Sequence, residues 1–160
     1  MSSNAYARSH PTLPLSSKRF VASPFAARYH ERAVSYGVYC DRLYPLSLGD
    51  DPEQRYWQLR RGALLYDVPE KPLEISGPDA GRFLDFVLTR PVSDMPANRA
   101  RYALACDWDG GLVMDGVVIR RGPDRFWYVH ANGDFLLWLN AHTQGFDVRV
   151  RDPRSHVVQV

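Results

Sequence analysis

Two polar side chains, Tyr102 and Asp115, lie in strand-like segments that are otherwise apolar. Tyr102 belongs to the alternating segment 99–107, and Asp115 interrupts the apolar run 112–121. The Asp-Gly pair in the turn between them predicts a tight hairpin. A carboxylate is costly to bury unless a partner compensates it. Asp115 therefore occupies an exposed or kinked strand position, pairs with a buried arginine, or orients a ligand.

Met114 and Asp115 are neighbours on the same predicted strand, so their side chains should point to opposite faces of the sheet. Only one of them can line a given cavity unless the strand bulges, and Gly116 would permit a bulge. The alternation favours a structural partner, such as a buried arginine, for Asp115.

The elements that position these residues are strands interleaved with helices. Strands are predicted over 63–68, 71–76, 99–107, 112–121, 125–130, 146–151 and 156–160, and helices over 25–34, 53–62, 80–88 and 132–144. Asp51 followed by Pro52 is typical of a helix start. Because hairpins alternate with helices, we expect the α+β class, with antiparallel strands and interleaved helices.

Five segments, taken in order, carry a resemblance to a known family. Residues 58–68 read QLRRGALLYDV, residues 73–84 contain LEISGPDA and FL, and residues 102–118 place a tyrosine before DWDGGLVMDGVV; residues 126–134 and 146–148 follow. This order resembles the folate-binding region of the glycine cleavage T-protein (aminomethyltransferase) family. The resemblance implies the first half of a T-protein-type folate-binding domain, with tetrahydrofolate as the cofactor.

The resemblance also implies four cofactor-binding residues: Tyr102, Met114, Asp115 and Asn132. In the aminomethyltransferases the first acid of an Asp-Asp pair contacts folate and the reacting amine, whereas this chain has Met114 there and keeps the second acid as Asp115. In this respect the chain is closer to the demethylase branch, which includes the dimethylsulfoniopropionate demethylases and carries a segment similar to 127–134. An asparagine that lines the site in the family falls one place later here, at Asn132. No catalytic residue is carried over.

Composition excludes several other classes of protein. The 20 basic and 18 acidic residues nearly balance, without the basic stripe of a nucleic-acid surface. No apolar run approaches the ~18 residues of a membrane span, and no secretory signal is evident, so we expect a cytoplasmic protein without a membrane partner. The histidines and cysteines lack the spacing of a metal site.

We expect residues 1–23, rich in serine, proline and alanine, to form a flexible lead-in. Residues 24–160 should be the N-terminal part of the folate-binding domain. Residues 156–160 read as a strand that stops without a turn, whereas in the family it continues into a second half. We therefore expect that the chain is truncated, lacks its C-terminal half and is inactive alone.

The function implied by the resemblance is tetrahydrofolate-dependent transfer of a methyl or aminomethyl carbon from a small methylated substrate, of the demethylase-like kind. An enzyme of the branch without the first acid is suited to a cationic methyl donor. Trp57, Tyr44 and Trp108 are candidates for the aromatic side chains that would face such a cation. Three alternatives stay open: a non-catalytic folate-binding protein of the iron–sulfur-assembly type, a glycine cleavage aminomethyltransferase proper, and a domain of a larger amine dehydrogenase.

Overall fold

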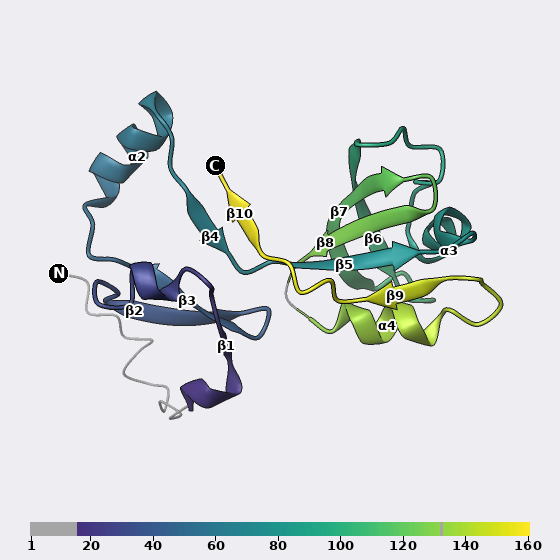
Figure 1. Ribbon diagram of the computed structural model, residues 1–160, viewed down its shortest axis with the longest axis horizontal. Coiled ribbons are helices and arrows are strands. Elements are labelled where there is room, and N and C mark those ends of the chain that lie inside the picture. Colours follow the sequence, from purple (N-terminus) through teal and green to yellow (C-terminus); the bar gives the residue numbers. More distant parts are fainter. Residues whose placement is uncertain (1–15, 132) are drawn as a thin grey trace.

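The computed structural model describes residues 16–131 and 133–160, which form three sheets and their connecting helices (Figure 1). The N-terminal elements are η1 (Ser17–Arg19), β1 (Val21–Ala22), η2 (Ala26–Arg28), β2 (Ser35–Tyr39) and β3 (Arg42–Ser47). Strand β3 lies between β1 and β2 and pairs parallel with β1 and antiparallel with β2. The later part of the expected lead-in thus contains a short paired strand, and residues 1–15 lie outside the described residues.

The helix predicted over 25–34 is reduced to the single 3-10 turn η2. Its apolar residues do not recur at a helical period, and none of the three residues in the turn is buried. No apolar face is therefore available to stabilise a longer helix. Helix α2 (Pro52–Arg61) does begin as predicted, because the Asp51 carboxylate accepts a hydrogen bond from the Gln54 amide at 2.9 Å.

The largest sheet has the strand order β6-β7-β8-β5-β9, and each neighbouring pair is antiparallel. Its strands are β5 (Lys71–Ser76), β6 (Ala100–Cys106), β7 (Leu112–Gly122), β8 (Arg125–His130) and β9 (Arg149–Arg151). Helices α3 (Ala80–Val87) and α4 (Phe135–Ala141) contribute buried side chains to the core on one face of this sheet. The α+β class with antiparallel strands and interleaved helices is confirmed.

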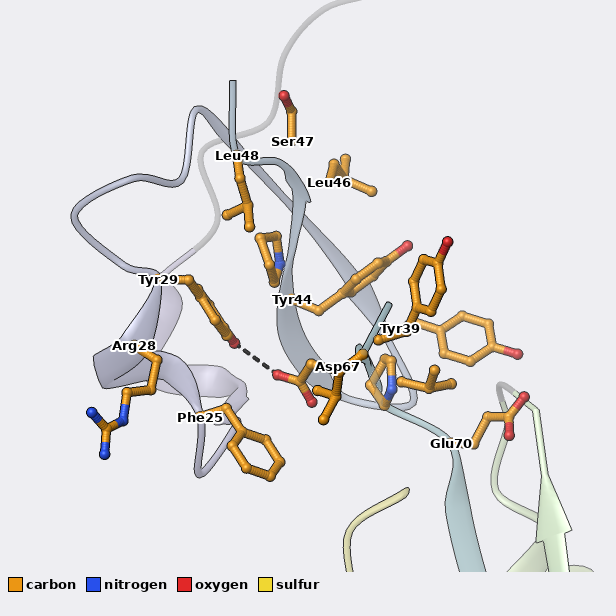
Figure 2. Close-up of a pocket in the computed structure, with 15 residues that line it drawn as sticks. Phe25, Arg28, Tyr29, Tyr39, Tyr44, Leu46, Ser47, Leu48, Asp67 and Glu70 are labelled. Atoms are coloured by element: carbon orange, nitrogen blue, oxygen red, sulfur yellow. Dashed lines mark hydrogen bonds between the residues drawn. The ribbon is translucent and has the colours of Figure 1, made fainter. Parts of the chain in front are cut away.

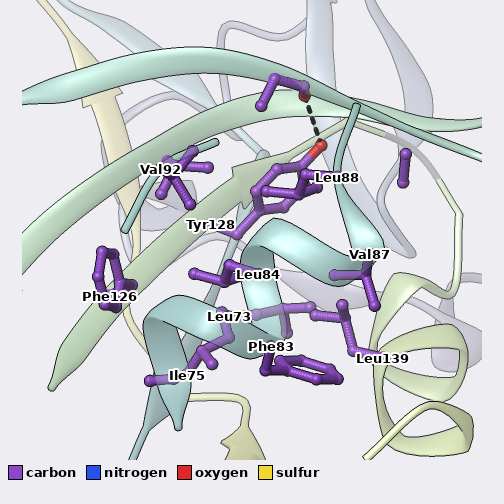
Figure 3. Close-up of a cluster of buried hydrophobic side chains, with 14 of the residues drawn as sticks. Leu73, Ile75, Phe83, Leu84, Val87, Leu88, Val92, Phe126, Tyr128 and Leu139 are labelled. Atoms are coloured by element: carbon purple, nitrogen blue, oxygen red, sulfur yellow. Dashed lines mark hydrogen bonds between the residues drawn. The ribbon is translucent and has the colours of Figure 1, made fainter. Parts of the chain in front are cut away.

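The core lies between the large sheet and its two helices (Figure 3). Phe83 and Leu84 of α3 pack against alternate residues of the strands, among them Phe126 and Tyr128 of β8. The Tyr128 hydroxyl donates a hydrogen bond to the Ala103 carbonyl at 2.9 Å, so its polar atom is satisfied inside the core. The alternation of buried and half-buried residues along β6, β7 and β8 leaves a second face without a described helix.

The chain enters and leaves the large sheet through one two-stranded ribbon. Strand β4 (Tyr66–Val68) precedes β5, and β10 (Val157–Gln159) returns beside it after β9. The two pair antiparallel, with Val157 opposite Val68. In Figure 1 this ribbon lies between the N-terminal elements and the large sheet. It therefore brings residues 66–70 close to both parts.

Glu74 carries a buried charge on the second face of the large sheet. Its carboxylate is 3% exposed and accepts hydrogen bonds from the Arg125 and Arg151 guanidinium groups and from the Trp127 indole at 3.1 Å. Burial alone would raise the pKa of Glu74, but these donors outweigh it and hold the pKa at about 2.

We expect acid to weaken the fold through Glu74. Since its pKa is lower in the folded chain than the ordinary value of 4.5, its stabilisation is present above that value and lost as pH falls toward 2. We expect Glu74 to contribute about 2 kcal/mol to the free energy of unfolding. This value includes a reduction for solvent screening, because both arginines are half exposed. Urea denaturation near neutral pH and near pH ~3 measures it. The wild type should lose more stability than Glu74→Gln, and equal losses would contradict this assignment.

Candidate functional site

An apolar pocket of about 660 Å³ lies between η2, the β2–β3 hairpin and the chain around β4 (Figure 2). Its walls carry five aromatic side chains: Phe25, Tyr29, Tyr39, Tyr44 and Tyr66. Two acidic residues, Asp67 and Glu70, and one base, Arg28, also line it. In Figure 2, Arg28 and Glu70 lie at opposite sides of the pocket, with Asp67 between them.

The Asp67 side chain is 11% exposed and is only partly hydrogen-bonded. The Tyr29 hydroxyl donates to its Oδ2 at 3.1 Å, whereas its Oδ1 is buried without a hydrogen bond. The Nε2 of His156 lies 3.7 Å from Oδ1. A buried oxygen without a hydrogen bond is costly to the fold.

His156 beside Asp67 is held in its neutral form. Burial and the nearby Arg42 charge lower the pKa of His156, although Asp67 opposes them. Arg42 lies 3.1 Å from the Nδ1 atom of His156, and a guanidinium can only donate. Nδ1 therefore accepts, and the ring proton resides on Nε2, on the side of Asp67. In this tautomer the Nε2–H group of His156 is on the side of the Asp67 carboxylate.

Tyr102 and Asp115, which the sequence singles out, are hydrogen-bonded to each other. The Tyr102 hydroxyl donates to Asp115 Oδ2 at 2.5 Å, and this bond raises the pKa of Tyr102. The register places Leu104 opposite Asp115, so Tyr102 is a diagonal neighbour of Asp115 on the same face of the sheet. The expected arginine partner is therefore replaced by a tyrosine, and the pair lies on the face without helices.

Glu70 connects this pair to the pocket. It lines the pocket, and burial raises its pKa, with a further increase from the negative charge of Asp115. The register places Lys71 of β5 and Gly116 of β7 both opposite His130 of β8, so Glu70 and Asp115 precede the same row of the sheet. The aromatic pocket and the Tyr102–Asp115 pair form one candidate site, with Glu70 at their junction.

Met114 does not join this site. It lies on the opposite face of β7, is 6% exposed and belongs to the core cluster. A Cβ on Gly133 would approach its Cε to 2.9 Å, so the loop before α4 packs tightly on it. Side-chain alternation along the strand explains the separation from Asp115. Asn132 lies outside the described residues.

Several other residues considered from the sequence are placed away from the site. Among the candidate aromatic walls, Tyr44 lines the pocket, whereas Trp57 on α2 lies beneath the Arg61 guanidinium and Trp108 is 83% exposed in the β6–β7 turn. His130 is buried and its Nδ1 lies 2.7 Å from the Ala131 carbonyl, and burial lowers its pKa. His130 is therefore a neutral core residue.

Within residues 16–131 and 133–160, no group of three or more His, Cys, Asp or Glu side chains is arranged to hold a metal ion. None of the helices in the same described residues is long and apolar enough to cross a membrane.

Comparison with known protein families shows which family the chain belongs to. The model of the GCVT N-terminal domain matches residues 22–160. The chain belongs to the GCVT N-terminal domain family. This match covers every described strand of the large sheet and the whole candidate site.

Two curated relatives of this chain carry the names of different enzymes. An aminomethyltransferase of Herpetosiphon aurantiacus is 33% identical over 106 residues, which are 63% of this chain and 29% of that protein. The dimethylsulfoniopropionate demethylase DmdA of Ruegeria pomeroyi is 30% identical over 141 residues, which are 86% of this chain and 38% of that protein. This chain thus spans about a third of the length of these relatives.

A solved structure shows the same fold. The glycine cleavage system aminomethyltransferase T from Bartonella henselae superimposes with a TM-score of 0.79 at 20% sequence identity. The match covers 87% of this chain and 40% of the Bartonella chain.

Asp67 and Glu70 are candidate site residues that were not predicted from the sequence. Asp67 follows the apolar residues 63–66, much as Asp115 interrupts its own apolar strand. A search for acids in apolar segments would therefore have found Asp67 as well. Glu70 offers no such signal, because it follows Pro69 in a turn. Its position beside Asp115 depends on the packing of β4 and β5 against the large sheet.

Proposed function

We propose that this chain is the folate-binding N-terminal part of a one-carbon transferase that moves a methyl group from a small donor to N5 of tetrahydrofolate. One observation supports this most strongly. Lys71 of β5 and Gly116 of β7 both lie opposite His130, so Glu70 of the aromatic pocket and Asp115 of the hydrogen-bonded pair each precede the same row of the sheet.

The residues of the pocket fit the chemistry of tetrahydrofolate. The pterin is a flat heterocycle with several N–H donors, and aromatic walls with few placed acceptors suit such a ligand. Tyr39 and Tyr44 offer aromatic surface, and the carboxylates of Asp67 and Glu70 are the acidic groups in the pocket wall. Tyr102 is exposed and adds a further aromatic surface beside Asp115.

The contribution of this chain to catalysis is positioning. When bound, tetrahydrofolate supplies the nucleophilic N5. Asp115 holds the Tyr102 hydroxyl in a fixed direction, and the apolar pocket walls exclude water from the bound ring. Orienting two reactants in this way can lower a barrier by roughly 7–11 kcal/mol at best, without a covalent intermediate on the protein.

One observation favours a methyl donor over an aminomethyl donor. Strand β7 carries Met114 beside its one acid, Asp115, instead of an acid pair. A donor with an activated, cationic methyl group needs no second acid, and the pocket aromatics suit a cation.

A product assay tests this proposal. The protein expressed from its complete reading frame is incubated with tetrahydrofolate and either dimethylsulfoniopropionate or an aminomethyl donor. We expect 5-methyltetrahydrofolate with the methyl donor and no turnover of the aminomethyl donor. Release of ammonia from the aminomethyl donor would contradict the demethylase branch. If tetrahydrofolate binds but neither donor reacts, a non-catalytic folate-binding protein is supported instead.

A further inference from the structure

Glu70 differs from the other acids of the candidate site in having no compensating partner. Asp67 accepts a hydrogen bond from Tyr29, and Asp115 accepts one from Tyr102. No described residue forms a hydrogen bond or ion pair with the Glu70 carboxylate, although the side chain is half buried in the pocket wall. A half-buried carboxylate with both oxygens available is poised to accept a proton or a hydrogen bond from a ligand.

The charged and titratable groups around Glu70 come from three elements. Asp115 of β7 repels its negative charge, and Cys40 in the β2–β3 turn lies near enough to be affected by that charge. The adjacent Lys71 is engaged elsewhere, because its Nζ lies 2.7 Å from Asp41 Oδ2. No described cation therefore holds Glu70 in its ionised form, and both burial and Asp115 raise its pKa.

Figure 2 shows where Glu70 lies with respect to the pocket. Its carboxyl group is at the side opposite Arg28, next to the strands of the large sheet. Asp115 and Tyr102 belong to those strands. A ring that fills the aromatic pocket and reaches the Tyr102–Asp115 pair would therefore pass the Glu70 carboxylate.

We propose that Glu70 is the base that accepts the N5 proton of tetrahydrofolate during methyl transfer. This inference rests on the proposed function. It adds a catalytic residue to a site whose other two acids, Asp67 and Asp115, already accept hydrogen bonds from tyrosines.

The step balances without a further reactant. The N5 lone pair forms the bond to the methyl carbon while the bond from that carbon to the donor heteroatom breaks, and its electron pair stays on the donor. The N5–H bond then breaks, its electron pair returns to N5, and the proton moves to a carboxylate oxygen of Glu70. Glu70 later releases the proton to water. A base with a raised pKa suits this transfer at neutral pH.

Proton uptake on product binding tests the role of Glu70 without a methyl donor. After transfer, protonated Glu70 should donate a hydrogen bond to the N5 lone pair of 5-methyltetrahydrofolate. Binding of this product to the free protein near pH ~7 should therefore take up roughly half to one proton per site. Calorimetry in two buffers with different ionisation enthalpies measures that number. Glu70→Gln should bind the product with essentially no proton uptake, and Glu70→Asp should retain it.

Glu53→Gln, an exposed residue in the first turn of α2, is the matched control and should take up protons as the wild type does. Thermal melting of each variant checks that it is folded. Equal proton uptake by wild type and Glu70→Gln would overturn the role of Glu70 while leaving folate binding intact. Failure of the wild type to bind either tetrahydrofolate or 5-methyltetrahydrofolate would instead overturn the proposed function. In single-turnover methyl transfer the Gln variant should be about 10²–10⁴-fold slower, and an unchanged rate would also contradict the proposal.

Discussion

Replacing Asp115 with asparagine should weaken tetrahydrofolate binding by about 10–100-fold while leaving the melting temperature nearly unchanged. A hydrogen bond that involves a charged group contributes about 1.5–3 kcal/mol, which corresponds to this range of affinity. Asp115 is only half buried, and its described partner is the hydroxyl of an exposed tyrosine. The fold therefore does not depend on its charge. Calorimetric titration and thermal melting of the same preparation measure both effects.

Two further variants show whether the pair acts as a unit. Tyr102→Phe removes the hydroxyl and should lower affinity to a similar extent, and the double variant should lose less than the sum of the two. Asp109→Asn in the β6–β7 turn makes the same change of charge at an exposed position and should bind normally. A melting temperature that falls by several degrees in Asp115→Asn, with affinity retained, would identify a structural role and contradict this account.

Met114→Asp should destabilise the chain by about 3–5 kcal/mol and create no aminomethyl transfer. Met114 is buried against the α4 side of the core, and no lysine or arginine is among the described residues around it there. An unpaired buried charge has a cost of this order. Urea denaturation measures the loss of stability, and an ammonia-release assay tests for the new activity.

Met114→Leu is the control, because it conserves volume and polarity and should cost less than about 1.5 kcal/mol. A stable, folded Met114→Asp protein would mean that position 114 is exposed to the pocket. That result would contradict the separation of Met114 and Asp115 onto opposite faces of β7.

The parts of the fold with regular side-chain periodicity were predictable from the sequence. The β6–β7–β8 meander and helix α3 follow from alternation and from 3/4 spacing, because each buries one apolar face against the same core. The prediction of a helix over 25–34 was wrong, because the apolar residues of this segment do not recur at a helical period. The pairing of β4 with β10 joins residues about 90 positions apart, and no local pattern could reveal it.

The candidate site was predictable only where chemistry and local pattern coincide. An acid in an apolar strand and a tyrosine near a tight turn identified Asp115 and Tyr102, and side-chain alternation correctly separated Asp115 from Met114. Their mutual hydrogen bond depends on strand register, which a hairpin can fix in several ways. The contributions of Asp67, Glu70 and Tyr29 depend on long-range packing around the β4–β10 ribbon.

The central claim is that the aromatic pocket and the Tyr102–Asp115 pair form a folate site. Calorimetric titration of the protein from its complete reading frame with tetrahydrofolate tests this claim most directly. We predict saturable binding to one site with a Kd in the micromolar range or below, equivalent to about −8 kcal/mol or more favourable, and binding at least about tenfold weaker for the 160-residue chain alone. Absence of saturable binding to the complete protein would contradict the claim.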